Sequence, residues 1–348
     1  MNIEEMLISN SKEIDRLIEK YIPKQISRTW LKNFNPSYEP DGIALQHAIN
    51  EPVWEFLNRG GKRFRPFLYL TLLEALGGDV KKYRDWAALI ELTHEGSIIV
   101  DDIEDNGLLR RGKPCLHRIF GIDIAVNAGN FMFFLPLLIF KKQRLEPELA
   151  SKAWQIWAEE MTTIHFGQAL DIWWHKKKTI PSEKQYMQMC AWKTGTLLRM
   201  AARLAGLFAG KDEVVQARLG RFAEMVGIAF QIQDDILDII ADRQRFGKAW
   251  GNDITEGKKT LMVIHTFKRA DKSDREELLA ILNSHTRNPV KIKRAIEIIK
   301  KYDSIQYAQK RAEEMANKAW KDIESILQEG KAKQRLKEFV EFLIKRRW

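Results

Sequence analysis

Cysteine is scarce in this sequence, whose 348 residues include only Cys115 and Cys190. Two cysteines cannot make the dense disulfide framework of a small secreted domain, so we expect a reducing compartment and place the protein in the cytoplasm. Strand patterns are also missing, because no alternating β-branched runs are joined by a hairpin turn. The sequence therefore excludes a disulfide scaffold and argues against an all-β fold.

Long uninterrupted apolar runs are missing as well. The longest stretch with almost no charge, residues 122–140, contains Asp123, two asparagines, a glycine and a proline. We interpret it as a buried core helix rather than a membrane span. Residues 1–20 mix charged and apolar positions at helical spacing, unlike the basic start and apolar core of a signal peptide. We therefore expect no transmembrane segment.

Basic blocks of the kind that bind nucleic acid are absent too. The formal net charge of +10 would suit nucleic acid, an anionic membrane or small polyanions such as diphosphates. However, the cations form no long block with interleaved aromatic residues, and no nucleic-acid-binding motif is recognisable. The basic residues of 291–348 are spread at helical intervals, which is typical of a solvated outer face. We expect no nucleic-acid partner, and a peripheral membrane contact of these residues stays open as an alternative.

Helical periodicity is what the sequence has in abundance. Apolar residues make up 45% of the chain, which suffices for a large core, and they recur at helical spacing. Short segments with glycine or proline separate the predicted helices, and none is long enough to be a linker. We therefore predict an all-α protein with a single domain over residues 1–348, in which residues 271–348 belong to that same domain.

Three aspartates, with Glu104 as a fourth acid, stand at the end of one predicted helix, in the stretch IIVDDIED. Asp101 and Asp105 are four residues apart and share a helix face, with Asp102 beside them. Such carboxylates repel one another unless a cation lies between them. Their oxygen atoms suit Mg²⁺, which usually takes one or two protein carboxylates together with water and substrate phosphate oxygens. Acids on a helix are more often simply solvated, but the apolar run before this cluster favours a site.

The same spacing recurs at Asp234, Asp235 and Asp238, in the stretch FQIQDDILDII. These acids are embedded among isoleucine, leucine and phenylalanine, where an unpaired carboxylate is costly, so partner cations are expected. We predict that the two clusters face each other across one site that holds magnesium ions and a polyanion.

Basic residues accompany both clusters. The segment GGKRFRP is predicted to open a helix with Lys62, Arg63 and Arg65 in its first turns, where backbone N–H groups add positive potential for phosphate. Arg110 and Arg111 can hold phosphate oxygens in bidentate fashion. Further candidates have a glycine within three residues, which lets the backbone approach a ligand closely: Lys193, Thr194, Lys248, Lys258 and Lys259.

The order of these motifs resembles that of a known family. The set GGKRFRP, ELTHEGSIIVDDIED, LRRGKP, GQALD, KTG, FQIQDDILD and GNDITEGKKT is similar to the trans-isoprenyl diphosphate synthases, the farnesyl and geranylgeranyl diphosphate synthases. The resemblance covers roughly residues 40 to 270. It implies an all-α fold with helices around a deep central cavity, usually in a homodimer. It also implies Mg²⁺-dependent condensation of isopentenyl diphosphate with an allylic diphosphate.

The resemblance further implies roles for individual residues. Two Mg²⁺ would be bound on the allylic diphosphate by Asp101 and Asp105, and a third by Asp234, with Asp238 acting through water. The remaining acids, Asp102 and Asp235, would support or share these ions. Matches to the isopentenyl diphosphate site are Lys62, Arg65, His94 and Arg111. Matches to the allylic diphosphate site are Arg110, Lys193 and Lys258, and those near the developing allylic cation are Thr194 and Gln231.

Four residues near these motifs have more than one possible role. A lone histidine on an apolar helix is usually a hydrogen-bonded core residue, but His94 lies two turns before Asp101 within the family pattern, so we predict a substrate ligand. Gln168 and Asp171 of GQALD either face the cation or make structural hydrogen bonds. Cys115 stands where the family commonly has a hydroxyl residue, and we do not expect it to touch the chemistry.

Product length is predicted from the helix before the first acid cluster. Each isoprene unit is about as long as one helical turn, ~5.4 Å, so depth along this helix measures the product. The residues one and two turns before Asp101 are small, namely Gly96, Ser97 and Thr93. We therefore predict geranylgeranyl diphosphate (C20), with C25 to C30 products or farnesyl diphosphate as alternatives. A phenylalanine at position 96 should shorten the product. Candidates for the floor of the tunnel are Leu89, Phe131, Phe133, Phe134, Phe166 and Trp173.

The sequence argues against two other functions. A class I terpene cyclase also ionises an allylic diphosphate with Mg²⁺, but it needs no isopentenyl diphosphate site, and the four residues that match that site are retained. A non-catalytic partner subunit could lose its acids freely, whereas both clusters are complete here. The prenyl-transfer interpretation is therefore preferred.

Overall fold

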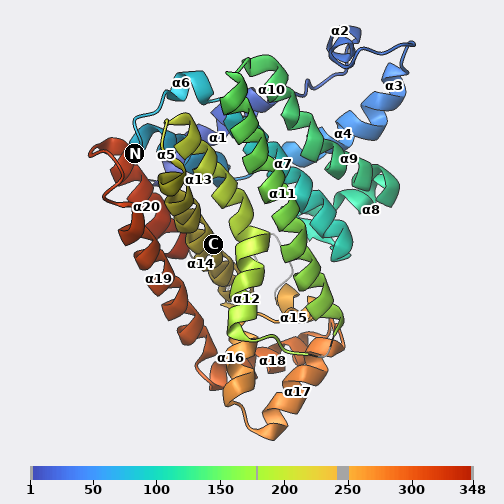
Figure 1. Cartoon of the computed structure of the whole chain (residues 1–348). Coiled ribbons are helices and arrows are strands. Elements are labelled where there is room, and N and C mark those ends of the chain that lie inside the picture. Colours follow the sequence, from blue (N-terminus) through green and yellow to red (C-terminus); the bar gives the residue numbers. More distant parts are fainter. Residues whose placement is uncertain (1–2, 178, 241–250, 346–348) are drawn as a thin grey trace. The chain divides into compact units, whose positions relative to one another are not determined.

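The computed structural model describes residues 3–177, 179–240 and 251–345, and their regular structure is almost entirely helical (Figure 1). The strands within these ranges are a two-residue antiparallel pair, β1 (Leu109–Arg110) and β2 (Lys113–Pro114). The all-α prediction is thereby confirmed. The chain divides into two compact units, Met1–Leu70 with Asp79–Ser151 and Thr71–Gly78 with Lys152–Trp348. That both units belong to a single domain stays a prediction.

The first unit is built from short helices around a long one. Its elements, in order, are α1 (Ile3–Glu19), α2 (Arg28–Leu31), η1 (Lys32–Phe34), α3 (Gly42–Leu45), the π-helix η2 (Gln46–Asn50), α4 (Glu51–Leu57), the first half of α5 (Phe64–Ala75), α6 (Val80–Tyr83), α7 (Trp86–Glu104), β1, β2, α8 (Leu116–Phe120), α9 (Ile122–Phe134), η3 (Leu135–Leu137), α10 (Leu138–Gln143) and the start of α11 (Pro147–Lys176).

The second unit consists of longer helices. It takes the end of α5, most of α11, α12 (Glu183–Cys190), the π-helix η4 (Ala191–Gly195), α13 (Thr196–Phe208), α14 (Glu213–Ile240), α15 (Asn252–Glu256), α16 (Leu261–Arg269), α17 (Lys272–Asn283), α18 (Pro289–Lys301), α19 (Ser304–Ile323) and α20 (Lys331–Lys345).

Helix α7 forms the core of the first unit. Its side chains from Trp86 to Thr93 are all buried, and it packs against α1 and α9. A glycine pair allows a close crossing with α9, because a Cβ at Gly96 would lie 2.8 Å from the carbonyl oxygen of Gly129, and one at Gly129 would lie 2.8 Å from Val100 Cγ2. This packing holds the end of α7, which carries the first acid cluster, against the rest of the unit.

The apolar stretch Ile122–Gln143 has the length and composition of a membrane span, a property it shares with core helices of soluble proteins. In its most apolar window 44% is buried. Ala125, Ala128, Gly129 and Met132 are buried on one side of α9, as a core helix requires. Part of the stretch therefore behaves as we predicted, whereas Phe134 is 63% exposed at its end.

Helix α14 occupies the equivalent place in the second unit. It packs against α13 and α19. The face of α19 toward the core consists of alanines at four-residue spacing, Ala308, Ala312 and Ala316, all buried, which lets the two helix axes approach closely. On α18 the isoleucines are buried and the lysines are exposed, so this basic region has the solvated outer face that its spacing predicted.

Candidate active site

The first acid cluster lies where α7 ends. Asp101 is in the last turn, and Asp105 is the residue that caps the helix. Both are partly exposed, whereas Asp102, on the other side of the helix, is 3% exposed. The four-residue spacing thus presents two of the three carboxylates together and turns the third inward.

Asp102 holds Arg110 rather than facing outward with its neighbours. Arg110 donates from Nε (2.9 Å) and Nη2 (2.5 Å) to Asp102 Oδ1, while its Nη2 lies 3.9 Å from Asp101 Oδ2. Burial alone would lower the pKa of Arg110, but the attraction of Asp102 outweighs it and raises that pKa above its usual value. The arginine is therefore charged and is held beside Asp101 and Asp102. That Asp102 binds magnesium stays a prediction. In this structure its carboxylate holds the Arg110 side chain in place.

Cys115 is closer to this chemistry than the sequence indicated. Its thiol is buried, and burial together with the nearby charge of Asp102 raises the pKa of the thiol to about 12. The thiol is therefore neutral beside the carboxylate that anchors Arg110. Our expectation that Cys115 stays clear of the proposed chemistry is therefore wrong, because the segment after β2 folds back onto the end of α7.

The predicted isopentenyl diphosphate residues gather in the first unit. Arg65 Nη1 lies 2.7 Å from His94 Nε2, and Arg111 donates from Nη2 to Glu95 Oε1 at 2.8 Å. Burial and the surrounding arginines hold the pKa of His94 well below its usual range, so the imidazole is neutral. Burial also lowers the pKa of Arg65, to about 10, which leaves it charged at neutral pH. Arg65, His94 and Arg111 thus form one polar cluster.

Two buried acids organise this cluster, and neither was predicted. Glu95 accepts hydrogen bonds from both Arg63 and Arg111, and Glu91 accepts from Arg63 at 2.9 Å. Both glutamates are at most 2% exposed. Burial raises the pKa of Glu91 to about 7, against the pull of Arg63. A signal was available, because these acids stand one turn apart on either side of His94, but buried acids at helical spacing look like solvated ones in sequence.

The GGKRFRP segment departs from our prediction. Helix α5 begins at Phe64, so Lys62 and Arg63 precede it and only Arg65 lies in its first turn. Arg63 adopts the left-handed φ of 46° and is 2% exposed. The three ion pairs of Arg63, to Asp15, Glu91 and Glu95, explain why the backbone turns here instead of starting the helix earlier. Lys62 in a substrate role stays a prediction.

The second acid cluster lies in the last turns of α14. Asp234 is partly exposed, as Asp101 is, while Asp235 and Asp238 are buried. Asp235 accepts from Tyr186 Oη (2.7 Å) and from Gln231 Nε2 (2.8 Å). Burial and the nearby charge of Asp253 raise the pKa of Asp235 to about 7.

Asp238 accepts hydrogen bonds from backbone N–H groups. It accepts from the N–H groups of Asn252 (3.2 Å) and Asp253 (3.0 Å), which begin α15. Lys258 follows that helix, with Nζ 3.5 Å from Asp253 Oδ1 and an ion pair of 2.5 Å to Glu256. Lys259 is buried, and burial lowers its pKa to about 8. Lys248, another predicted phosphate ligand, lies outside the described residues.

The KTG motif forms the π-helix η4. The wider turn of a π-helix fits here because glycines on the neighbouring helices leave room for its backbone. A Cβ at Gly167 would lie 2.3 Å from the backbone nitrogen of Lys193, and one at Gly227 would lie 2.6 Å from Gly195 Cα. Lys193 Nζ donates to Asp171 Oδ2 at 2.5 Å, and Thr194 Oγ1 donates to Gln231 Oε1 at 2.6 Å. The sequence motif thus places both side chains in a defined geometry.

Asp171 of the GQALD motif is the counterion of Lys193. Its other oxygen lies 2.9 Å from His175 Nε2, one turn further along α11. Burial would raise the pKa of Asp171, but Lys193 and His175 bring it well below its usual range. Of the two roles left open for Asp171, the structure shows the hydrogen-bonded one.

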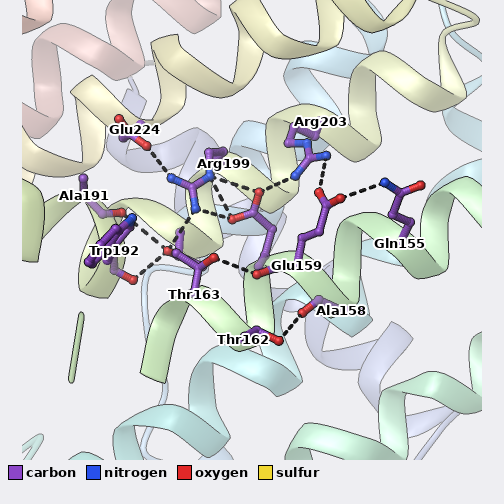
Figure 2. A network of polar contacts seen from close by, with 12 residues as sticks. Gln155, Ala158, Glu159, Thr162, Thr163, Ala191, Trp192, Arg199, Arg203 and Glu224 are labelled. Carbon is purple, nitrogen blue, oxygen red and sulfur yellow. Dashed lines mark hydrogen bonds and ion pairs between the residues drawn. The ribbon is translucent and has the colours of Figure 1, made fainter. Parts of the chain in front are cut away.

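A polar network clamps the helix that follows the π-helix (Figure 2). Arg199 donates to both oxygens of the buried Glu160 (3.0 and 2.8 Å) and pairs with Glu224, while Arg203 bonds Glu160 (2.7 Å) and Glu159 (2.7 Å). These contacts tie α11, α13 and α14 together directly beyond η4. Because two arginines share one buried glutamate, removing that acid would leave each arginine with a single acidic partner, Glu224 for Arg199 and Glu159 for Arg203.

The three residues predicted to set product length, Gly96, Thr93 and Ser97, have different surroundings. A Cβ at Gly96 would meet Gly129 O at 2.8 Å and Met132 Cβ at 2.9 Å, so this position faces α9. Thr93 is fully buried, and Ser97 Oγ donates to the carbonyl of His94 at 2.7 Å. Their role in product length stays a prediction, but a large residue at position 96 would first meet another helix.

The floor candidates divide in the same way. Leu89 and Phe133 are buried, at 1% and 7% exposure. Phe134, Phe166 and Trp173 are 63%, 55% and 58% exposed, so in this structure they do not form an enclosed floor. The sequence could not separate these aromatic residues because their burial depends on neighbouring helices.

The acid clusters fit a Mg²⁺ ion that takes its other ligands from water and phosphate. In the part of the chain that the structure describes, no group of three or more His, Cys, Asp or Glu side chains is arranged to hold a metal by itself. Each cluster instead presents partly exposed carboxylates, Asp101 with Asp105, and Asp234. This is the donor set that Mg²⁺ accepts when water and phosphate oxygens complete its shell.

Known proteins share this chain's sequence and fold. Residues 46–299 match the family described as polyprenyl synthetase. A short chain isoprenyl diphosphate synthase from Methanothermobacter thermautotrophicus is 35% identical over 290 residues, which cover 83% of this chain and 88% of that protein. A geranylgeranyl pyrophosphate synthase from Geoglobus acetivorans is 31% identical over 99% of both chains. The crystal structure of a geranylgeranyl pyrophosphate synthetase from Pyrococcus horikoshii matches with a TM-score of 0.86 at 33% identity, covering 99% of this chain and 98% of that one.

Proposed function

Since the chain belongs to the polyprenyl synthetase family and is a prenyl-transferring enzyme of that family, we propose that it makes geranylgeranyl diphosphate from isopentenyl diphosphate and an allylic diphosphate. The single observation that carries this proposal at the level of residues is the pairing of two cations with buried acids. Two predicted diphosphate ligands each have a buried counterion, Asp102 for Arg110 in the first cluster and Asp171 for Lys193 in the KTG motif. Cations held in this way are ready for a diphosphate.

Both cations are proposed to bind the allylic diphosphate, as the resemblance implies. Its bond from the allylic carbon to oxygen breaks, the electron pair leaves with the diphosphate, and Arg110, Lys193 and Lys258 stabilise the charge that develops there. Magnesium ions, when bound, would neutralise further diphosphate charge, held by Asp101, Asp105 and Asp234. We propose three ions, as the resemblance implies.

The allylic cation is proposed to form next to Thr194 and Gln231, whose side chains are hydrogen-bonded to each other. The alkene of isopentenyl diphosphate attacks the cation, forming one carbon–carbon bond. A proton then leaves the neighbouring carbon, and the released diphosphate is the base that takes it. Arg65, His94 and Arg111 are proposed to hold the diphosphate of isopentenyl diphosphate, with the neutral imidazole as a hydrogen-bonding group rather than an acid.

A homodimer is proposed on the resemblance. The exposed apolar side chains Ile122, Val126 and Phe134 on α9 support it, because monomers rarely leave such residues together on one helix. Sedimentation equilibrium would test this. The cytoplasm is the proposed location, in keeping with two buried, unpaired cysteines.

The test is product analysis. The protein is incubated with Mg²⁺, labelled isopentenyl diphosphate and either dimethylallyl, geranyl or farnesyl diphosphate, and the dephosphorylated products are sized by chromatography. We expect C20. Products of C25 to C30 or C15 would correct the length alone. Hydrocarbon release without isopentenyl diphosphate would indicate a terpene cyclase, and no product at all would indicate a non-catalytic subunit.

A further inference from the structure

We infer that Tyr186 and Asp235 fix the direction of a hydrogen-bond chain that ends at Thr194, so that the Thr194 hydroxyl presents lone pairs and not its hydrogen to the developing cation. The inference rests on the proposed function, which places that cation beside Thr194. It assigns a positioning role to Tyr186, which the sequence did not single out, and it gives Asp235 a role other than binding metal.

Four side chains from three elements make up the chain. Tyr186 on α12 donates to Asp235 Oδ2 (2.7 Å), and Gln231 Nε2 donates to Asp235 Oδ1 (2.8 Å). Thr194 on η4 donates to Gln231 Oε1 (2.6 Å). Gln231 and Asp235 stand four residues apart on α14 and therefore share a helix face. All these residues belong to the second unit.

The direction of each hydrogen bond follows from the chemistry of Asp235. Both oxygens of Asp235 accept hydrogen bonds, one from Tyr186 and the other from Gln231, so the amide of Gln231 turns its NH₂ group toward Asp235. The carbonyl end of the same amide then faces Thr194. A carbonyl oxygen only accepts, so the Thr194 hydroxyl must donate. Its hydrogen is used in that bond, and the lone pairs of Thr194 are what it offers to any other group.

Burial protects this direction. Tyr186, Asp235 and Thr194 are 1%, 5% and 9% exposed and Gln231 is partly exposed, so water has little access to three of the four members of the chain. Tyr186 occupies the second oxygen of Asp235 and keeps the carboxylate in one orientation. The π-helix contributes as well, because the close contacts of Gly167 and Gly227 hold the backbone that carries Thr194.

The consequence for catalysis is electrostatic. An oxygen lone pair beside an allylic cation stabilises it, whereas the hydrogen of a hydroxyl pointing the same way would destabilise it. Dipoles that are oriented in advance cost no reorganisation when the charge develops. Tyr186 lies two partners away from Thr194, so it acts through Asp235 and Gln231.

The test compares two tyrosine substitutions. Tyr186→Phe removes the donor to Asp235, while Tyr307→Phe removes an equivalent bond elsewhere in the same unit, from Tyr307 Oη to Glu183 Oε2 at 2.7 Å. We expect kcat to fall about 10- to 100-fold in Tyr186→Phe, the scale of losing one pre-oriented group. The KM of both substrates and the Mg²⁺ concentration for half-maximal rate should stay unchanged, and Tyr307→Phe should be within about twofold of wild type.

A double-mutant cycle separates positioning from general structural damage. Thr194→Val keeps the shape of the side chain but removes the hydroxyl. If Tyr186 acts through Thr194, adding Tyr186→Phe to Thr194→Val should lower kcat no further. Asp235→Asn gives a second route should Tyr186→Phe fold poorly, because an asparagine can present NH₂ to Gln231 and allow the chain to reverse. It too should lower kcat without a change in Mg²⁺ requirement.

Three results would overturn the inference while leaving the proposed function standing: equal kcat in the two tyrosine variants, multiplying losses in the cycle, or a raised Mg²⁺ requirement in Tyr186→Phe or Asp235→Asn. The last would make Asp235 a metal ligand. A wild-type protein that forms no prenyl product with any allylic diphosphate would instead refute the proposed function, and this inference with it.

Discussion

The two acid clusters have the same sequence pattern but different surroundings. The middle acid of the first, Asp102, holds a guanidinium, whereas the middle acid of the second, Asp235, holds the neutral donors of Tyr186 and Gln231. The last acids differ as well: Asp105 caps α7 and is partly exposed, whereas Asp238 is buried against the backbone of α15. One spacing therefore serves two purposes, and only the first acid of each cluster has the same environment.

The largest expected effect tests what the clusters share. Asp101→Ala and Asp234→Ala should each lower kcat by about three orders of magnitude or more, because each removes a predicted metal ligand worth several kcal/mol to the transition state. Both variants should keep the circular dichroism spectrum and melting temperature of the wild type, since both residues are partly exposed. Near-normal turnover in either variant would remove its metal assignment and make the two clusters unequal in this respect also.

A smaller effect tests how the clusters differ. Asp102→Ala removes the hydrogen-bonded counterion of the partly buried Arg110 and should reduce the free energy of unfolding by about 2–3 kcal/mol. Asp235→Ala leaves only neutral donors unsatisfied and should cost about 1–2 kcal/mol. Urea denaturation of both variants measures the difference. Equal losses would show that charge at the middle position does not distinguish the clusters.

Glu91 in the first unit contributes to the pH dependence of stability, as does Asp235 in the second unit, whose pKa burial raises to about 7 as well. The pKa of Glu91 is raised by burial to about 7 in the folded protein, so the folded state binds this proton more tightly than the unfolded state. The stability this proton provides is present at pH 5 and is lost as pH rises from about 5 through 7, with an upper limit of about 3 kcal/mol. Glu91→Gln should flatten this part of the curve in denaturation at pH 5.5 and 8. An unchanged slope in Glu91→Gln would place the titrating group elsewhere.

The smallest expected effect concerns the helix before the first cluster. Gly96→Ala puts a methyl group within 3 Å of α9 and should cost about 1–3 kcal/mol, while Gly42→Ala, whose Cβ meets nothing within 4 Å, should be nearly neutral. Thermal melting compares the two. Gly96→Phe is expected to destabilise the protein before it alters product length. Should that variant stay folded and make C15 product, the original interpretation of Gly96 as a tunnel residue would be restored.

Much of the fold was predictable because it depends on local pattern. Helical periodicity and the near absence of strand signals gave the all-α class, and the ordered motifs identified the family that the comparisons then showed. The sequence also grouped Arg65, His94 and Arg111 through the resemblance, and the structure brings these three together in one unit.

Other features of the site were not predictable from spacing. Glu95 lies one residue from His94, yet nothing in the sequence shows that it binds Arg63 and Arg111 at once. Cys115 looked unconnected to the chemistry until the chain after β2 returned it to Asp102. In both cases the partners are separated by many residues, and helical spacing carries no information about such contacts.

The sequence by itself determined which residues share a helix face, because the rise and twist of an α-helix bring side chains four positions apart onto one side whatever surrounds them. The tertiary structure alone decided which carboxylate of each cluster is turned inward and which group it meets there. That choice follows from the cost of burying charge, which each inward acid offsets with a donor from outside its own helix: Arg110 of β1 for Asp102, and Tyr186 of α12 for Asp235.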